Sequence, residues 1–455
     1  MSDLLSLLGM GAGALAAHNS GVSVASNNVA NANTQGYSRQ RVDMEALQGT
    51  PLAGGVRAGD PQRLASSMLA GRIRVAGGAL AMSRAFSEAL SDAEFRLVGS
   101  GASVDQQIAS LFSRMNGVAS TPTDGPARDA VVAAARDLVS GIRSRAAAID
   151  AAQREADQRV RDQVEQATSL AKQIASANKA IAISNDPVLR DQRDTAAQKL
   201  TELVGGDARI DADGQMRFVL AGGAVLVDGT RASSLQATPD ATTGLARLEV
   251  VDGASRRDVT GAIGGGRIGA ELAFRDVTVP NTTAQLDQLA YDVATQINAV
   301  HTAHAGLDGV SGRPMFTAPA GVAGAAKALA VDPGLAADSS RLATAAVGAG
   351  PGSNAGALAM FQLASQKVAS GGTRTLTDAA LGIVASLAPQ NADAKADAAA
   401  GVLVADHLAG LRDSVSGVDV QEELTNLARF EHASNALTKF VSTIDDMLGT
   451  LIANL

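Results

Sequence analysis

The chain has 455 residues, of which 46% are hydrophobic but only 2% aromatic, and it lacks Trp. Its formal net charge is −8 and no basic run occurs, which argues against a nucleic-acid-binding protein. Cys is absent, which excludes disulfides and Cys-ligated metal sites, and no stretch of about 18 apolar residues could insert in a membrane. A core of Ala, Leu and Val favours closely packed helices over a deep ligand pocket.

The N-terminal segment predicts a helix with an apolar side chain at every seventh position. Its two interleaved rows are Met1, Leu8, Leu15, Val22, Val29 and Leu4, Gly11, His18, Ala25. This spacing is typical of a coiled coil, and the small residues permit close approach of a partner helix. Residues 4–17 are as apolar as a signal-peptide core, but Asp3 precedes them and the first basic residue is Arg39, so we expect no cleavage.

A turn cluster is expected to end this helix. The repeat stops at Asn27 and Asn28, and residues 31–36 read Asn-Ala-Asn-Thr-Gln-Gly. Asn and Gly tolerate left-handed backbone and are typical of turns. Residues 39–47 then alternate loosely between polar and apolar side chains, which predicts an extended arm.

The middle of the chain is predicted to be mostly helical around one β-rich island. Helical patterns cover residues 126–178 (one long helix or a helix pair), 187–203, 286–304 and 376–414. Between residues 207 and 266 the pattern changes to short strands, with Asp213-Gly214 placed for a tight hairpin turn. Helical sequence resumes at Gly269, and residues 317–352 predict short elements and loops.

The C-terminal segment mirrors the N-terminal one. Its two seven-residue rows are Leu427, Ser434, Val441, Leu448, Leu455 and Phe430, Leu437, Ile444, Leu451. Ser416-Gly417 is expected to end the preceding helix. Asp419 is placed to cap the last helix, with Glu422 three residues on as its partner in a capping box.

These patterns predict a mainly α fold with an inserted β-rich domain, in which a discontinuous N- and C-terminal helical coiled coil joins a long-helix bundle. We expect a terminal helical assembly domain (1–38 and 420–455), a helical bundle domain (39–206 and 269–419) and an inserted β-rich outer domain (207–268). Because an isolated end helix is marginally stable, we expect the ends to become ordered on assembly. Packing of both ends on the chain's own body is the alternative.

Three motifs could carry chemistry, but a structural role is favoured for each. Residues 264–269 match a dinucleotide-binding fingerprint without a surrounding βαβ unit, so a domain-junction loop is favoured. His301 and His304 lack a nearby third ligand, which favours a surface or cap role over metal binding. Residues 211–214 lack the further acidic ligands of a calcium loop. We predict no catalytic residue, no metal and no cofactor, and therefore not an enzyme.

Both ends carry motifs that resemble one family. Residues 24–40 (VASNNVANANTQGYSRQ) resemble the N-terminal signature of bacterial flagellar rod, hook and hook-associated proteins, and residues 416–430 (SGVDVQEELTNLARF) resemble their C-terminal signature. Gly417 replaces the Asn usual in rod and hook subunits, and together with Tyr37-Ser38-Arg39-Gln40 it resembles the hook-associated branch at the hook–filament junction. Residues 431–435 depart from the family, whose members typically carry aromatic and Gln-rich sequence there.

The repeats and the resemblance together define the expected assembly residues. The N-terminal seam consists of Leu4, Leu8, Leu15, Val22 and Val29, and the N-terminal axial motif of Asn28, Asn31, Asn33, Gly36 and Tyr37. The C-terminal seam, which is also the implied chaperone-binding stripe, consists of Leu427, Phe430, Leu437, Val441, Ile444, Leu448 and Leu451. The C-terminal motif consists of Ser416, Gly417, Val418, Glu422 and Glu423.

The resemblance implies a structural subunit that joins flagellar hook to filament outside the cell, after type III export without a cleaved signal peptide. The implied partners are further copies in a ring, hook protein, a second junction protein (FlgL-like), the filament cap during assembly and a cytoplasmic export chaperone (FlgN-like). Another axial subunit, such as hook or rod protein, is the alternative. An alternative of a different class is a secreted hydrolase, which would need a catalytic site outside the terminal helices.

Overall fold

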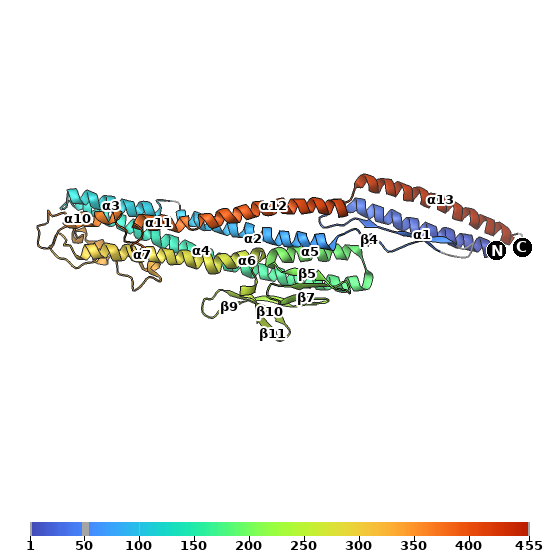
Figure 1. Cartoon of the computed structure of the whole chain (residues 1–455), viewed down its shortest axis with the longest axis horizontal. Helices are drawn as coiled ribbons and strands as arrows, with labels where there is room; N and C mark the ends of the chain where they lie inside the picture. Colours follow the sequence, from blue (N-terminus) through green and yellow to red (C-terminus); the bar gives the residue numbers. More distant parts are fainter. Residues whose placement is uncertain (1, 48–53, 100, 454–455) are drawn as a thin grey trace.

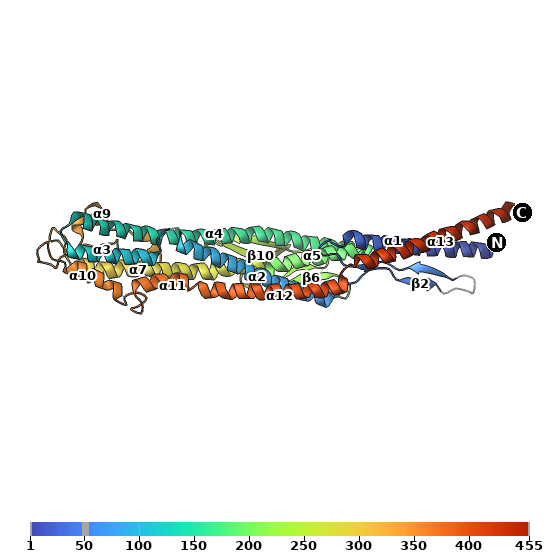
Figure 2. The ribbon, with the colours of Figure 1, turned by 90° about the horizontal axis from the view of Figure 1, so that it is seen from above.

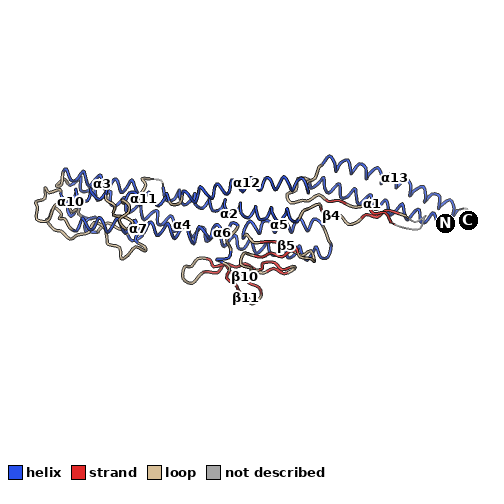
Figure 3. Tube along the Cα trace, viewed as in Figure 1, coloured by secondary structure: helices blue, strands red, loops and turns tan. Residues whose placement is uncertain are grey.

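The molecule is elongated, and both chain ends lie at the same tip (Figure 1). A computed structural model describes residues 2–47, 54–99 and 101–453. Long helices dominate it, and a small β-rich segment lies against the middle of the helical body (Figure 3). The predicted fold class, mainly α with a β-rich insertion, is therefore confirmed. Within the described residues, no helix combines the length and apolarity needed to span a bilayer.

The tip is formed by the first and last helices and a two-stranded ribbon. Helix α1 (Ser2–Asn31) runs away from the tip and α13 (Val420–Ala453) runs back to it, so the two pack antiparallel (Figures 1 and 2). In the ribbon, β1 (Gln40–Arg41) pairs with β4 (Gln62–Arg63) and β2 (Met44–Leu47) with β3 (Gly55–Ala58). The ribbon packs along α1 and not in the helical bundle, to which the sequence assigned these residues.

The long helices of the body begin and end at recognisable signals. Helix α4 (Gly125–Ser184) is a single helix of 60 residues, capped by Asp124, whose side chain accepts from the Ala127 N–H. It ends at Asn185, which adopts left-handed backbone with φ +50°. The other long helices are α2 (Ser67–Val98), α3 (Val104–Ser120), α5 (Pro187–Val204), α7 (Val279–Thr302) and α12 (Ala388–Ser416).

The end of the body far from the tip has a core of its own. Short helices follow α7 in that region: α8 (Ala325–Ala328) and α9 (Pro333–Ala337), which lie in the Ala- and Gly-rich stretch predicted to hold short elements, then α10 (Ala355–Gln362) and α11 (Leu376–Ala385). The helical pattern predicted over residues 376–414 is divided between α11 and α12. They pack against α3, α4 and α7. The largest fully buried side chains of this core include Arg128, Leu138, Phe274 and Phe316. With few aromatics available, closely packed aliphatic side chains fill the rest.

His301 lies inside this core, so the surface or cap role favoured from the sequence is wrong for it. Its side chain is fully buried, and its Nε2 accepts from the Ala343 N–H at 3.0 Å. The other nitrogen, Nδ1, must then carry the proton that it donates to the Arg313 carbonyl at 2.7 Å. Burial lowers the pKa of His301, which favours the neutral ring. No group of three or more His, Cys, Asp or Glu side chains in the described part of the chain could hold a metal ion.

The β segment (residues 207–258) consists of two antiparallel sheets. Strands β5 (Asp207–Ile210), β6 (Met216–Val219), β7 (Val225–Asp228) and β8 (Arg231–Ala232) form the first sheet. Strands β9 (Ser234–Pro239), β10 (Ala246–Asp252) and β11 (Ser255–Asp258) form the second. The predicted turn joins β5 to β6 at residues 211–215, where Asp211 accepts from backbone N–H groups and Gly214 has φ +75°.

The chain enters and leaves the β segment at one place. A Cβ on Gly205 would stand 3.0 Å from the Cα of Gly265, so the two glycines lie back to back. Gly266, with φ +63°, begins α6 (Gly266–Ala273), and a Cβ there would stand 2.6 Å from the carbonyl of Leu203. Gly265, Gly266 and Gly269 of this stretch thus serve close backbone packing. A five-residue π-helix (Phe274–Thr278) then connects α6 to α7.

Candidate assembly site at the paired chain ends

Two glycines of α1 receive large side chains of α13. A Cβ on Gly21 would stand 2.9 Å from ring carbons of Phe430, and a Cβ on Gly11 would stand 2.9 Å from Cγ2 of Val441. The same Phe430 ring lies 6.0 Å, centroid to centroid, from the ring of His18. We call these two glycine positions the notches of α1. Because they lack side chains, the helices can approach closely there, and the two contacts determine which residues lie opposite each other.

The face of α1 that is buried consists mainly of small residues. Gly11, Ala17, Gly21, Val24 and Ala25 are buried there. The predicted seam Leu4, Leu8, Leu15, Val22 and Val29 lies at the flank of this face and is half-buried throughout. Met1 lies outside the described residues. The second seven-residue row of α1, which includes Gly11 and Ala25, therefore lies closer to α13 than the row that includes Leu8 and Leu15.

On α13, the predicted seam is covered unevenly. Ile444 and Leu448 are buried, Leu451 is exposed, and the half-buried members are Leu427, Phe430, Leu437 and Val441. Ser434, the polar interruption of the repeat, donates a hydrogen bond of 2.9 Å to Asn19 Oδ1 on α1. One intramolecular partner helix thus covers only part of the apolar surface of α13.

A second apolar row beside this contact is only partly covered, since ring carbons of Phe440 lie 3.2 Å from where a Cβ on Gly11 would stand. Phe440, Met447 and Leu451 follow one another at seven and four residues and are 39%, 51% and 42% exposed. On α1, Leu5 is 58% exposed. We call Phe440, Met447 and Leu451 the tip flank. A row of large apolar side chains at helical spacing is suited to packing against a further helix.

At the base of the helix pair, Asn28 connects three segments of the chain. Its side chain is fully buried, and its Oδ1 accepts from the Gln40 N–H at 2.9 Å and from the Tyr37 hydroxyl at 2.8 Å. Its Nδ2 donates to the Gln40 carbonyl at 2.9 Å and to Glu423 Oε2 at 3.1 Å. Every hydrogen-bonding position of the amide is therefore used.

Arg39 joins the N-terminal motif to the start of α13. Its Nε donates to Glu423 at 2.8 Å, and its Nη2 lies 2.6 Å from Glu422. Its backbone N–H donates to the Ser416 carbonyl at 2.9 Å. Asp419 caps α13 by accepting from the Gln421 N–H at 2.9 Å, but Glu422 pairs with Arg39. The expected capping box is therefore replaced by an ion pair that reaches across the chain.

The same network is anchored on α5. Ser38 donates from its N–H and its hydroxyl to the two oxygens of Asp191, at 2.9 and 2.8 Å. Arg63 donates to Asp191 and Asp194 at 2.9 and 2.8 Å. Burial, followed by the nearby carboxylates of Asp191 and Glu423, raises the pKa of Tyr37 to about 12. We call the set Asn28, Tyr37, Ser38, Arg39, Arg63, Asp191, Glu422 and Glu423 the base network.

The structure brings together some of the predicted motif residues and leaves others apart. Asn31 donates to the Asn27 carbonyl within its own turn, Asn33 is exposed, and Val418 is half-buried. Gly36, with φ +89°, lies against Thr195 of α5. Gly417 is required by space, because a Cβ there would overlap the Asp413 carbonyl oxygen. Asn28, Tyr37, Ser416, Glu422 and Glu423 meet in or next to the base network.

Sequence reasoning missed the α5 half of this network. Asp191 and Asp194 are one helical turn apart, which is also common on solvated helix faces. Nothing in the local pattern connects them to Ser38, which lies 153 residues away from Asp191 in the chain. Ser38 and Arg39 could have been found, since they stand inside the motif that ends at Gln40.

Comparison with known proteins matches the N-terminal end and part of the body to flagellar families. The family model described as "Flagella basal body rod protein" matches residues 8–37. The family model described as "Flagellar hook-associated protein FlgK helical domain" matches residues 90–316. The chain is also similar to a solved structure, the flagellar hook junction protein FlgK from Burkholderia pseudomallei, with a TM-score of 0.69 and 17% identity over 76% of this chain and 100% of that one. This likeness concerns the fold.

Curated relatives give the same result. The chain is 27% identical to flagellar hook-associated protein 1 of Salmonella typhimurium over 329 residues, and 28% identical to that of Escherichia coli over 337 residues. These alignments cover 69% and 68% of this chain but only 59% and 60% of the relatives' length. With flagellar hook-associated protein 1 of Bacillus subtilis, identity is 26% and 96% of both chains is covered.

The paired terminal helices, the long helical body and these matches define a flagellar axial protein. Within that class, the chain belongs to the FlgK family, the hook-associated protein 1 family.

Proposed function

We propose that this chain is a structural subunit of the bacterial flagellum that forms the junction between hook and filament. The observation that carries the proposal is the apolar surface that remains uncovered when α1 and α13 pair. The names of its relatives, hook-associated protein 1 and hook junction protein, support the location. The role is structural, and it requires helix packing but no catalytic residue.

The tip flank is the surface through which copies of the chain join. Each copy contributes a pair of helices whose closest contact is intramolecular and whose large apolar side chains point partly outward. Placing such pairs side by side around an axis would cover the tip flank of each copy by the half-buried α1 row of the next. The coiled-coil spacing of both helices supports this packing.

Further partners follow from membership of the family. They are further copies in a ring, hook protein on one side, a second junction protein (FlgL-like) on the other, and the filament cap during growth. Export takes place through the flagellar type III system with the N-terminal segment retained. A cytoplasmic chaperone (FlgN-like) covers the C-terminal seam and the adjoining tip flank before export, because the exposed side chains of Phe440, Met447 and Leu451 would otherwise form an aggregation-prone row.

Two adjacent residues of α13 separate assembly from folding. Met447 is exposed in the single chain, whereas Leu448 is buried against the chain's own helices. In cells that lack the native protein, Met447→Asp should leave the monomer's helix content and stability unchanged but leave hooks without filaments in electron micrographs. Leu448→Asp should also disturb the monomer.

Asn435→Asp, a charge on an exposed position away from the apolar face, is the matched control and should restore motility. Normal filament growth with Met447→Asp would show that the tip flank is not an assembly surface. A Met447→Asp monomer that has lost its helix content would instead show that the tip flank is needed for folding.

A further inference from the structure

Three side chains of α4 hold peptide groups of the β segment. They are Asp157, Thr168 and Asn178, separated by 11 and 10 residues, which is about three helical turns each. At about 1.5 Å per residue, the three positions span roughly 32 Å of the helix. Both sheets of the β segment are held in this way.

Thr168 and Asn178 each bind both peptide groups of one strand residue. The Thr168 hydroxyl donates to the Leu235 carbonyl at 2.7 Å and accepts from the Leu235 N–H at 3.0 Å, on β9. Asn178 Nδ2 donates to the Met216 carbonyl at 2.8 Å, and its Oδ1 accepts from the Met216 N–H at 3.0 Å, on β6. These side chains therefore do for the strands what a neighbouring strand would do.

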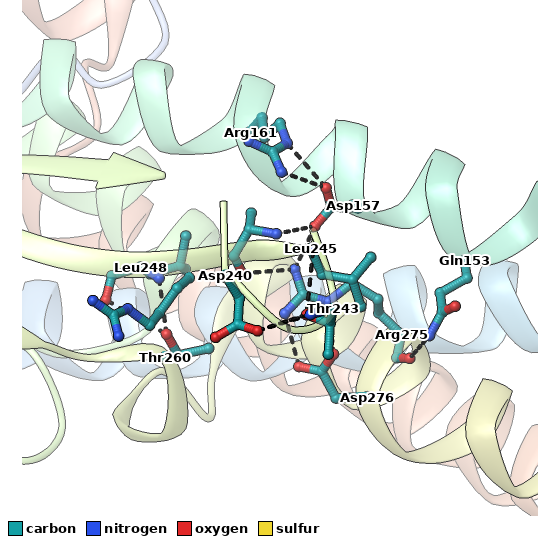
Figure 4. A network of polar contacts seen from close by, with 12 residues as sticks. Gln153, Asp157, Arg161, Asp240, Thr243, Leu245, Leu248, Thr260, Arg275 and Asp276 are labelled. Carbon is teal, nitrogen blue, oxygen red and sulfur yellow. Dashed lines mark hydrogen bonds and ion pairs between the residues drawn. The ribbon is translucent and has the colours of Figure 1, made fainter. Parts of the chain in front are cut away.

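Asp157 achieves the same result with the help of Arg275. Asp157 Oδ1 accepts from the Ala246 N–H at 2.7 Å, and Arg275 Nη1 donates to the Ala246 carbonyl at 2.9 Å. The two charged groups also pair with each other at 2.6 Å, and both are more than nine-tenths buried (Figure 4). Gln153 donates to the Arg275 carbonyl at 2.9 Å, which ties the π-helix to α4 as well.

The position of these contacts coincides with a change in what covers α4. Up to Ala156, buried residues of α4 belong to the core at the far end of the body. From Val160 onward they belong to a second core, which α4 shares with α5, α6 and the β segment. Asp157 lies between the two cores, and Phe218, Leu226 and Leu248 of the strands fill the second one.

We propose that the β segment is a brace for the C-terminal half of α4. Peptide groups fixed at three points along the helix, over a shared core, make α4 and the strands one rigid body. The brace lies where the elongated body would otherwise depend on α2, α4, α5, α6 and α12 to resist bending (Figure 1). This inference goes beyond the proposed junction role and does not depend on it.

Distance measurement between spin labels tests the rigidity directly. The chain has no Cys, so labels on Lys172→Cys of α4 and Ser255→Cys of β11, both exposed positions, would be the only ones. The brace predicts a single narrow distance distribution in the purified chain. A broad distribution, or two populations, would overturn it.

Amide exchange tests whether the strands stiffen the helix. Thr168→Val leaves both peptide groups of Leu235 unpaired and should raise exchange at least about tenfold in β9 and, equally, in residues 160–175 of α4. Thr168→Ser keeps the hydroxyl and should leave both segments protected. Faster exchange in β9 alone would show that the strands only rest on α4 and do not brace it. The label distances require no change in the three holding side chains, so a broad distribution would overturn the proposal even if Thr168→Val unfolds the chain.

Discussion

At the scale of single residues, Asn28 shows why an amide suits the base of the helix pair. Its oxygen accepts two hydrogen bonds and its nitrogen donates two, one of them to the buried carboxylate of Glu423. A carboxylate of the same shape would lose both donors and repel Glu423. A shorter side chain would leave peptide groups of Gln40 unpaired in a buried place.

We therefore expect Asn28→Asp to lower the free energy of unfolding by about 1–3 kcal/mol, because buried groups lose their partners. Urea denaturation followed by circular dichroism measures this change. Asn27→Asp, one residue earlier and exposed, introduces the same charge and should change stability by less than about 0.5 kcal/mol. Equal effects of the two substitutions would argue against the four-bond role of Asn28.

Tyr37 predicts a loss of stability at high pH. Its pKa is about 12 in the folded chain, against 10.0 for an unperturbed tyrosine. Because folding raises the pKa, the protonated hydroxyl contributes stability that is fully present below about pH 10 and is lost as the pH rises toward 12. Ultraviolet titration should show a late-ionising tyrosine, and Tyr37→Phe should remove that component. A titration curve that is unchanged by this substitution would contradict the raised pKa.

At the scale of elements, the close contact between α1 and α13 depends on two positions of α1 that have no side chain. Phe430 and Val441 of α13 occupy the space above Gly21 and Gly11, where a Cβ would stand 2.9 Å from their carbon atoms. Backbone and side chain can yield only partly at such a distance, so the helices would have to move apart. The two notches lie ten residues apart, and together they fix the register of the pair.

Gly21→Ala should consequently destabilise the α1–α13 pair even though Ala favours helix over Gly by about 1 kcal/mol. We expect a net loss of about 1–3 kcal/mol for the terminal helices, seen as faster amide exchange in both. Gly9→Ala is the matched control, since no atom lies within 4 Å of the Cβ it would add, and it should stabilise α1 slightly. Equal protection in both variants would mean that the notch at Gly21 does not set the contact.

The sequence predicted many of the elements, though not α2 and α3, and it did not predict which faces meet. Seven-residue spacing identified α1 and α13, and local pattern also predicted the turn before β6 and a helical region in α4, without deciding between one long helix and a helix pair. Spacing alone assigned the seam to the larger side chains, such as Leu8 and Leu15. Packing instead selects the smaller row, because close approach buries more backbone and leaves the large residues at the flank. Which row meets a neighbouring copy stays a prediction.

At the scale of the whole molecule, local stability should follow the distribution of core. The two large clusters of buried side chains cover the body from Ala89 to Ala394, whereas the described part of the tip consists of one helix pair and a ribbon. The contacts of Asp191 could not be predicted from the sequence, because contacts between residues far apart in the chain leave no local pattern. Burial, not helix propensity, decides which part opens first.

For the purified monomer we expect fast amide exchange over roughly residues 1–35 and 430–455 and slow exchange in α3, α4 and α7. Mass spectrometry of the exchanged chain would show this contrast, and assembly should remove it by covering the tip flank. Protection at the ends that matches the body in the free monomer would mean that the intramolecular pair suffices for order. The control is the same measurement on Leu448→Asp, in which exchange should become still faster at the ends and stay unchanged in α3, α4 and α7.

The back-to-back placement of Gly205 and Gly265 has a consequence for how such a chain can change over time. Because the β segment begins and ends at one place, insertions or deletions within it need not shift α5 and α6, the helices on either side of it. Tolerance of substitutions and insertions should be greatest at the outer edge of the β segment, where all four residues of β11 are exposed. This tolerance should be least on the inner side, because any replacement for β6 and β9 would still have to present peptide groups to Thr168 and Asn178.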